Sequence, residues 1–285
     1  MIDIVQPELI GTSTRFERPR TGIIRVVLPA YNEQKSLPAL LERLDLAFEE
    51  SALQGDILIV NDGSTDDSVR VVRSYTGQSP VRLLDLQPNR GLAEALKNGL
   101  LTAVSECEAG DIIITMDADN THTPGLILRM VRMIREGSDV VIASRYRPGS
   151  RVRGVSTLRK FLSLGASLLF CGLVRIPGVR DYTSGYRAYR AELLEAAFDL
   201  YRDELIHQTG FACMAELLLK LNTFGPIIHE VPVILRYDMK AGASKMRVWR
   251  TVGETLSMLS RYVFTGYLID GHYHRGVKRE SAPRR

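Results

Sequence analysis

The sequence predicts an α/β fold in which a mainly parallel sheet carries helices on both of its faces, within a single domain. The chain has 285 residues, 45% hydrophobic and 25% charged, so it is long enough for a full core and unlike a disordered segment. Short apolar runs alternate with amphipathic patterns of about 10 to 16 residues, which is the arrangement of βαβ units. Such units build parallel sheets that are covered on both faces.

Each element of the first half follows from its hydrophobic pattern. Apolar runs that predict buried strands lie at residues 23–29, 56–60, 81–86, 111–117 and 139–145. Helical patterns lie at residues 36–50, 66–75, 91–106 and 124–136. In the second half we expect a loop at 146–160, helices at 191–200 and 211–222, a strand at 227–235 and a last helix at 246–264. The expected organisation is a loose extension (1–22), the α/β domain (23–250), a C-terminal helix (251–270) and a basic, flexible tail (271–285).

The net charge of +4 arises from the tail. Lys and Arg number 37 against 33 Asp and Glu, and residues 271–285 hold five basic residues and one acid, which alone give +4. The remainder is neutral, so we expect no nucleic-acid partner. Cys107, Cys171 and Cys213 lie far apart and form no CxxC pair, which disfavours disulfides and a zinc cluster and predicts a cytoplasmic protein. No signal peptide is expected, and the apolar stretch 161–174 is too short to span a bilayer of about 30 Å.

Polar loops that bear acidic residues follow three of the predicted strands. Open α/β sheets bind ligands outside the carboxyl ends of their strands, so these loops are the candidate site. Neither GxGxxG nor GxxxxGK[ST] is present, which excludes those nicotinamide and ATP sites. Asp62 lies in the second loop, where NDGSTDD also fits a simple turn with Ser64 or Thr65 as a helix N-cap.

The loop after the fourth predicted strand contains an Asp-x-Asp pair, Asp117 and Asp119. An EF-hand is excluded because His122 and Leu128 stand where that loop requires Gly and Glu. The remaining metal reading is Mg²⁺ or Mn²⁺ held by one or two carboxylates, substrate phosphates and water. The alternative is helix capping, because Pro124 begins a predicted helix just beyond.

The strongest charge asymmetry lies between Asp139 and Asp181. This interval contains no acidic residue and eight basic ones, and the basic residues flank the apolar stretch 161–174. Guanidinium groups pair bidentately with phosphate, so the pattern suits an anionic group at a lipid surface. The alternative is a buried helix with arginines that extend around it to solvent.

With these loops in view, the chain resembles the family 2 glycosyltransferases and, within them, the polyprenyl-phosphate (dolichol-phosphate mannosyltransferase) branch. The resemblance covers residues 23–250. It rests on LPAYNE (28–33), VNDGSTDDS (60–68), NRGLAEALKNGL (89–100), MDADNTHTP (116–124), ASRY (143–146), DYTSGYRAYR (181–190), GFACMAELLLK (210–220) and EVPVILRYDMKAGASKM (230–246). It implies a GT-A-like, Rossmann-like fold.

The resemblance also implies roles for single residues. Those expected to hold the nucleotide of a sugar nucleotide are Pro29, Tyr31, Glu33 and Asp62. Asp117 and Asp119 are expected at the diphosphate and the metal. The positions that match phosphate-binding residues for the acceptor or donor are Arg145, Arg159, Ser163 and Lys245.

Three departures from the family pattern stand out. The chain has Asn120 and Thr123 where similar proteins often have DADLxHPP, so a third metal ligand would have to be Thr121. Met239 stands where many have Arg, with Lys240 beside it as a substitute. The transmembrane tail common in the branch is absent, so we expect peripheral contact with the cytosolic face of a membrane.

The implied activity is inverting transfer of a hexose, mannose from GDP-mannose in the first instance, to a polyprenyl phosphate. A UDP-sugar donor is the first alternative. A sugar hydroxyl as acceptor would need a carboxylate base, for which Asp181 is the candidate. A third possibility is a non-catalytic module that binds nucleotide sugars or anionic lipids.

Overall fold

The computed structural model of the protein describes residues 22–154 and 176–239, together with the single positions 165, 172, 253 and 257. Several sequence-based expectations lie outside these residues. They are the N-terminal extension, the apolar stretch 161–174, the C-terminal helix and tail, and Arg159, Ser163, Lys240 and Lys245.

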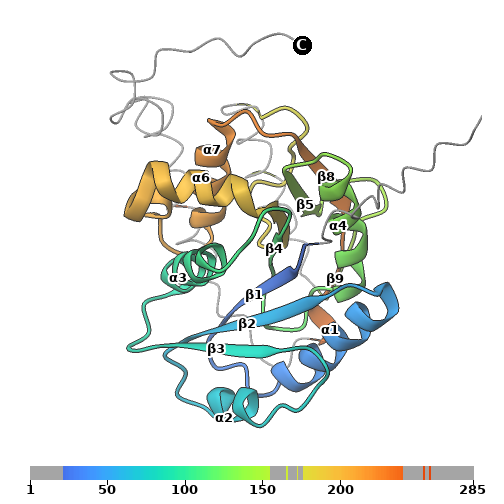
Figure 1. Cartoon of the computed structure of the whole chain (residues 1–285), viewed down its shortest axis with the longest axis vertical. Helices are drawn as coiled ribbons and strands as arrows, with labels where there is room; N and C mark the ends of the chain where they lie inside the picture. The colour runs from blue at the N-terminus through green and yellow to red at the C-terminus, as the bar shows by residue number, and fades with distance from the viewer. Residues whose placement is uncertain are drawn as a thin grey trace, which may run out of the picture.

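A seven-stranded sheet forms the centre of the fold (Figure 1). Its strands are β3 (Val81–Leu86), β2 (Gly55–Asp62), β1 (Ile24–Ala30), β4 (Ile112–Thr115), β7 (Arg187–Arg190), β5 (Val140–Ser144) and β8 (Ile228–Pro232), in that spatial order. Strand β7 is antiparallel to its neighbours β4 and β5, and the other pairs are parallel. The predicted α/β fold with a mainly parallel sheet is therefore confirmed.

Helices cover both faces of this sheet, as the alternating pattern predicted. One face packs against α3 (Leu92–Ser105), α6 (Ala191–Tyr201) and α7 (Ala212–Asn222). The other packs against α1 (Leu37–Ser51), α2 (Ser68–Arg73) and α4 (Ile127–Arg135). Short 3₁₀ turns are η1 (Pro124–Leu126), η2 (Arg202–Leu205) and η3 (Tyr237–Met239). Among the described residues, no helix is both long and apolar enough to cross a membrane.

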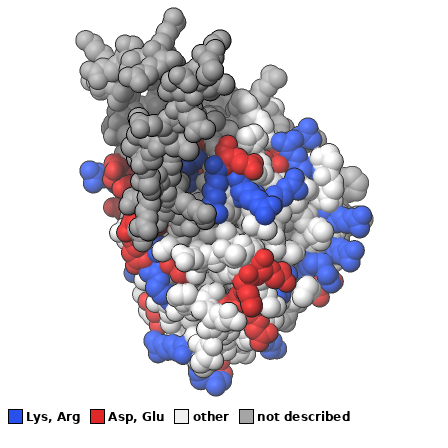
Figure 2. All heavy atoms as spheres, turned by 45° about the vertical axis from the view of Figure 1, so that its right-hand side comes forward, with Lys and Arg blue, Asp and Glu red and all other residues white. Residues whose placement is uncertain are grey.

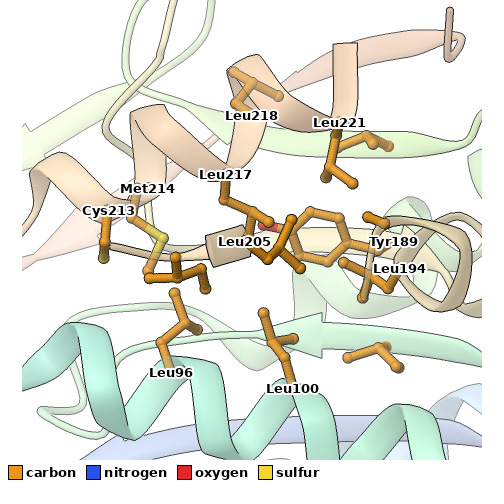
Figure 3. Close-up of a cluster of buried hydrophobic side chains, with 14 of the residues drawn as sticks. Leu96, Leu100, Tyr189, Leu194, Leu205, Cys213, Met214, Leu217, Leu218 and Leu221 are labelled. Atoms are coloured by element: carbon orange, nitrogen blue, oxygen red, sulfur yellow. The ribbon is translucent and has the colours of Figure 1, made fainter. Parts of the chain in front are cut away.

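The core on the α3 side lies between α3 and α7. Leu96 and Leu100 of α3 face Met214 and Leu217 of α7, with Tyr189 of β7 beside them (Figure 3). These side chains are almost completely buried, so they contribute to the apolar stabilisation of the fold on this side. These contacts connect α3, from the first half of the chain, with α7, from the second half.

Strand β7 is the largest difference from the sequence-based prediction, which had no strand there. It has four residues, and the side chain of Arg187, its first residue, is completely buried. The guanidinium donates to the backbone oxygens of Met214 and Tyr182, both at 2.7 Å. A strand this short with a buried arginine leaves no apolar run, which is why its pattern was not recognised.

The predicted strand at 227–235 divides in two, β8 and β9 (Ile234–Arg236). Pro232 is the last residue of β8 and has no N–H to continue the ladder with β5. The chain then pairs in a second, two-stranded sheet with β6 (Arg151–Arg153), which lies inside the predicted loop 146–160. The expectation of an unbroken loop there is wrong for those three residues.

Candidate active site

The carboxyl ends of β1, β2 and β4 meet at one edge of the sheet, because β1 lies between the other two strands and is parallel to both. Ala30 at the end of β1 is in register with Asn61 of β2, and Val27 is in register with Thr115 at the end of β4. The loops that follow therefore begin side by side. The edge thus carries the predicted nucleotide and metal residues Pro29, Tyr31, Glu33, Asp62, Asp117 and Asp119.

The loops after β1 and β2 are fastened together by side-chain hydrogen bonds to backbone groups. The backbone N–H of Asn32 donates to Oγ of Ser64 at 2.9 Å, and the N–H of Thr65 donates to Oδ1 of Asn32 at 2.8 Å. The N–H of Glu33 donates to Oγ of Ser68 at 2.8 Å. Asn32 has a φ of 53°, a left-handed conformation that Asn tolerates. The two loops therefore form a single frame.

This frame corrects one part of the simple-turn interpretation of NDGSTDD, the helix cap. The turn itself is present, because the N–H of Ser64 donates to Oδ1 of Asn61 at 3.2 Å. Helix α2 begins at Ser68, and the residue at its N-cap is Asp67, with no side-chain cap hydrogen bond. Ser64 and Thr65 contact the first loop and do not cap the helix. Tyr31 is 36% exposed at the rim of the frame, while Pro29 and Glu33 are half-buried. A flat, exposed ring beside ordered polar groups suits contact with a nucleoside.

Asp62 anchors a third loop to the end of β2. Its carboxylate accepts the backbone N–H of Arg90 and of Gly91, each at 2.8 Å, and Nδ2 of Asn89 at 2.9 Å. The residue is 3% exposed. These donors use most of the lone pairs of the carboxylate. Asp62 thus fixes the loop at Asn89–Gly91 to the end of β2, and any direct contact with a nucleotide would use its remaining capacity.

The loop from Asp117 to Thr121 is shaped around the carboxylate of Asp119. Oδ1 of Asp119 accepts the backbone N–H of Thr121 at 3.1 Å and its hydroxyl at 2.6 Å. Asn120 between them has a φ of 61°, and its Oδ1 accepts a hydrogen bond from the guanidinium of Arg43 on α1. The turn η1 begins later, at Pro124, and has no side-chain cap hydrogen bond. The helix-capping alternative for this loop is therefore wrong.

Two residues that the sequence analysis did not assign to the site lie against Asp117. The backbone N–H of Asp117 donates to Nδ1 of His122 at 3.3 Å, and the His122 ring packs on Tyr186 with centroids 5.0 Å apart. Gly185 lies behind the Asp117 carboxylate, and its carbonyl accepts the Thr115 hydroxyl at 2.8 Å. The glycine in TSGYR was the available signal for this close approach.

The donors at this edge fit a hard divalent cation. Asp117 and Asp119 supply carboxylate oxygens, which Mg²⁺ and Mn²⁺ accept together with water and phosphate oxygens. No cluster of three or more His, Cys, Asp or Glu side chains suited to a metal occurs within residues 22–154 and 176–239. The Thr121 hydroxyl donates a hydrogen bond to the Asp119 carboxylate, so its first role is to orient that carboxylate. A cation here would depend on the substrate for the rest of its ligands.

Asp181 holds Arg145 in a fixed position. Its carboxylate accepts the backbone N–H and Nε of Arg145, both at 2.9 Å, and Nη2 at 2.6 Å. Asp181 is completely buried. Burial alone would raise the pKa of Asp181, but the positive charge and hydrogen bonds of Arg145 outweigh burial and lower it.

This geometry corrects the hypothesis that Asp181 is a general base. A base must reach the proton that it removes and must have a pKa high enough to hold it. Asp181 is out of reach of solvent and is committed to a guanidinium. We therefore assign Asp181 to the positioning of Arg145.

Arg145 is the one predicted phosphate-binding residue that lies within the described residues. Besides its bonds to Asp181, Nη2 donates to the hydroxyl of Thr183 at 2.6 Å. Burial disfavours its charged form, but the charge of Asp181 outweighs burial and raises the pKa of Arg145. On the face that Figure 2 shows, basic side chains stand among acidic ones. A guanidinium held in place, more than a broad basic surface, is the feature that suits a phosphate.

The sequence matches the family described as glycosyl transferase family 2 over residues 25–198. The chain belongs to glycosyl transferase family 2. The matched residues run from β1 to α6, so they include the loops that hold Asp62, Asp119 and Asp181.

Three similar proteins each match more than three quarters of this chain. A dolichol-phosphate mannosyltransferase of Pyrococcus furiosus is 29% identical over 259 residues, which are 90% of this chain and 66% of the relative. An undecaprenyl-phosphate mannosyltransferase of Micrococcus luteus is 33% identical, covering 84% of this chain and 93% of the relative. A polyprenol monophosphomannose synthase of Mycolicibacterium smegmatis is 30% identical, covering 78% and 80%.

Solved structures show the same fold. Glucosyl-3-phosphoglycerate synthase from Mycobacterium tuberculosis, in complex with Mn²⁺, UDP and phosphoglyceric acid, matches with a TM-score of 0.57 and 23% identity. The match covers 84% of this chain and 78% of that one. The same enzyme with Mg²⁺ and UDP matches with a TM-score of 0.55. At this identity the likeness establishes the GT-A-like fold.

Proposed function

We propose that the protein is a metal-dependent, inverting glycosyltransferase that moves mannose from GDP-mannose to a polyprenyl phosphate. The observation that carries the proposal is one contact. The turn that follows Asp181 brings Gly185 against Asp117, so the carboxylates suited to a metal and diphosphate lie beside the turn whose first residue holds Arg145. This placement suits a reaction between two phosphate-bearing substrates. The names of the relatives from Pyrococcus, Micrococcus and Mycolicibacterium support the same acceptor class and sugar.

Different residues at the sheet edge would hold different parts of the sugar-nucleotide donor. The frame made by the loops after β1 and β2 would hold the nucleoside, with Tyr31 at its rim. Asp117 and Asp119 would hold Mg²⁺ or Mn²⁺, which would neutralise the charge that develops on the diphosphate leaving group. Thr121 keeps the Asp119 carboxylate oriented through its 2.6 Å hydrogen bond. Arg145 would hold the acceptor phosphate.

In the proposed reaction, a phosphate oxygen of the acceptor forms a bond to the anomeric carbon while the bond to the diphosphate breaks. The lipid product keeps the acceptor phosphate, and the nucleoside diphosphate leaves. The second pKa of a phosphate monoester is about 6, so the acceptor is ionised near neutral pH and needs no strong base. The commitment of Asp181 to Arg145 therefore favours a phosphate acceptor over a sugar hydroxyl, which would need a base.

A UDP-sugar donor is the alternative that a specific observation favours. The solved structures with the same fold include complexes with UDP and with UDP-glucose. The hydrogen bonds described for the frame after β1 and β2 join protein groups to one another, so they favour neither base. Measured affinities for GDP and for UDP will therefore decide which base the donor carries.

A donor panel tests the proposed function. The full chain is incubated with GDP-mannose, UDP-glucose or UDP-galactose, a short polyprenyl phosphate, and Mg²⁺, Mn²⁺ or EDTA, and the glycolipid is detected by mass spectrometry. We expect mannosyl-phosphoprenol from GDP-mannose with either metal and none with EDTA. A matched polyprenol without its phosphate serves as the control. Transfer to this control, or equal turnover in EDTA, would contradict the proposal.

We further propose that the protein works at the cytosolic face of a membrane without crossing it. The acceptor is a lipid, and the basic tail and the apolar stretch 161–174 are the sequence features that would contact the surface. Co-sedimentation of the full chain with anionic liposomes at low and high salt measures this contact. Binding at low salt that weakens at high salt is expected. A chain that stays in the supernatant at low salt contradicts the membrane proposal.

A further inference from the structure

A second arginine stands beside Arg145 at the carboxyl end of β5, and it too meets a buried carboxylate. Nε of Arg147 lies 3.0 Å from Oε2 of Glu230 on β8, and the side chain of Glu230 is completely buried. These two atoms are oriented as an ion pair and not as an aligned hydrogen bond. Nη2 of Arg147 also donates to the carbonyl of Gly178 at 3.0 Å. Arg147 therefore has a fixed partner, as Arg145 does.

The two carboxylates are connected to each other through the backbone. Oε1 of Glu230 accepts the N–H of Arg180 and the N–H of Asp181, both at 2.7 Å. Glu230 therefore fixes the peptide that carries Asp181, and the Asp181 carboxylate in turn fixes Arg145. A single buried glutamate thus contacts one arginine directly and the other through one intermediate.

The charges in this cluster are arranged by depth. The Asp181 and Glu230 side chains have no exposed surface, whereas the side chains of Arg145 and Arg147 are 22% and 30% exposed. A third guanidinium, Arg187, is completely buried and donates to the carbonyl of Tyr182, the residue after Asp181. Three guanidinium groups and two carboxylates leave one net positive charge, and the exposed guanidinium surface among them belongs to Arg145 and Arg147, which are two residues apart in the chain.

We propose that Arg147 is a second phosphate-binding arginine beside Arg145, and that Glu230 is the positioning residue that sets both guanidinium groups. This inference rests on the proposed polyprenyl phosphate acceptor. A phosphate monoester presents three acceptor oxygens, and planar guanidinium groups held in place lose less side-chain entropy when they bind such oxygens. Glu230 itself contacts no substrate and acts through the two arginines.

The proposal differs from a purely structural role in what it does to the two substrates. A residue that only stabilised the fold would weaken the binding of donor and acceptor together, in proportion to the fraction unfolded. A positioning residue for the acceptor phosphate affects the acceptor alone. The binding of the two substrates must therefore be measured separately, along with thermal stability.

The experiment uses the full chain and the variants Glu230→Gln, Arg147→Met and Arg147→Lys. Affinity for a short polyprenyl phosphate and affinity for GDP with Mn²⁺ are each measured by calorimetry, and thermal unfolding is followed in parallel. We expect Glu230→Gln and Arg147→Met to weaken acceptor binding by about tenfold or more, and GDP binding to stay within about twofold. Arg147→Lys should recover part of the loss, since it keeps the charge and loses the fork. Glu195→Gln on the exposed face of α6 is the control.

The outcomes separate this inference from the proposed function. Acceptor binding in Arg147→Met or Glu230→Gln that equals the wild type overturns the inference and leaves the acceptor assignment standing. Equal losses for GDP and acceptor in both Arg147 variants also overturn it. A wild-type protein that binds GDP and fails to bind polyprenyl phosphate overturns the proposed function, and the inference with it. Glu230→Gln removes a buried charge. Where this variant does not fold, the two variants of Arg147, whose side chain is 30% exposed, decide the test.

Discussion

Gly185 lies so close to Asp117 that a methyl group on it would contact the carboxylate. A Cβ at this position would be 3.2 Å from Oδ1 of Asp117 and 3.4 Å from Cε of Met214 on α7. The first distance is tighter than most Cβ contacts, so the carboxylate would have to move by a few tenths of an ångström. The turn from Asp181 to Tyr186 thus sets where the Asp117 carboxylate can be.

Gly185→Ala is expected to lower turnover by about tenfold or more, because a small misplacement at the reacting centre is costly. The accompanying loss of stability is about 1–3 kcal/mol from overpacking. Turnover and urea unfolding are measured on the same preparations. Gly125→Ala is the matched control, since a Cβ there meets nothing within 4 Å. Wild-type turnover in folded Gly185→Ala would show that the position of Asp117 is not critical.

Asp119→Ala is expected to keep the fold and to reduce turnover by about two orders of magnitude or more, through lost stabilisation of the leaving group. The residue lies in a loop at the sheet edge, so its removal leaves the apolar core intact. Circular dichroism checks the fold, and turnover is measured across a Mn²⁺ titration. Asp199→Ala on the exposed side of α6 is the control. A folded variant with near-normal activity would contradict the metal assignment.

Two variants of Thr121 test whether its hydroxyl orients the Asp119 carboxylate. The Thr121 hydroxyl donates to Asp119 at 2.6 Å, so Thr121→Val should weaken apparent Mn²⁺ affinity by about tenfold, as the loss of an orienting partner does. Thr121→Ser keeps the donor and should retain most of the affinity. The measurement is the Mn²⁺ concentration at half-maximal turnover. An unchanged value in Thr121→Val would mean that Asp119 is held by the backbone alone.

Asn120 couples the loop from Asp117 to Thr121 to α1 through Arg43. Asn120→Val should destabilise the protein by about 1–2 kcal/mol, because a β-branched residue is strained at a φ of 61°. Asn120→Gly accepts this φ and loses only the amide. If the Arg43 contact orders the loop, Asn120→Gly and Arg43→Met should each weaken Mn²⁺ affinity, and the double variant should be no worse than either. Additive losses would show that the two residues act independently.

Asp45 on α1 provides a pH test that is independent of the site. Burial alone would raise the pKa of Asp45, but hydrogen bonds from Ser79, Tyr75 and Gln78 lower it. Because the pKa is lower in the folded protein than the unfolded value of about 3.9, this stabilisation is present above that pH and is lost as the pH falls through the folded value. The difference in unfolding free energy between wild type and Asp45→Asn should therefore be full at pH 7 and shrink below about pH 4. A constant difference from pH 7 to pH 3 would contradict the assignment.

The sequence was sufficient for the parts of the fold that depend on local pattern. Strands β1, β2 and β4 are buried on both faces, so they appear as apolar runs, and the loops after them were located correctly at one sheet edge. The break after Pro232 was also available, because proline lacks the N–H that a continued ladder needs. In these cases one residue type at one position carries the structural information.

The rest of the site depends on contacts between residues far apart in the chain. Arg145 and Asp181 are 36 residues apart, and they meet because β7 returns antiparallel beside β5. Their pairing reversed the role expected of Asp181, from a base to a positioning group. Glu230 lies a further 49 residues from Asp181. It is the first residue of the family motif at 230–246, but the motif gives it no role and does not show that it contacts Asp181. Such partners are specified by topology, which no local spacing encodes.

The antiparallel direction of β7 has a consequence for how this protein can diverge. Because β7 runs against β5, the chain that leaves β5 after Ser144 comes back to the same sheet edge before Arg187, and Arg147 is bonded to the carbonyl of Gly178 where the two ends meet. A change of length between those points leaves the pairing of β5 with β7 in place, but it must keep β6, whose residues Arg151–Arg153 pair with β9. Divergence in this connection is therefore limited on one side by Arg147 and β6, and on the other side by Gly178.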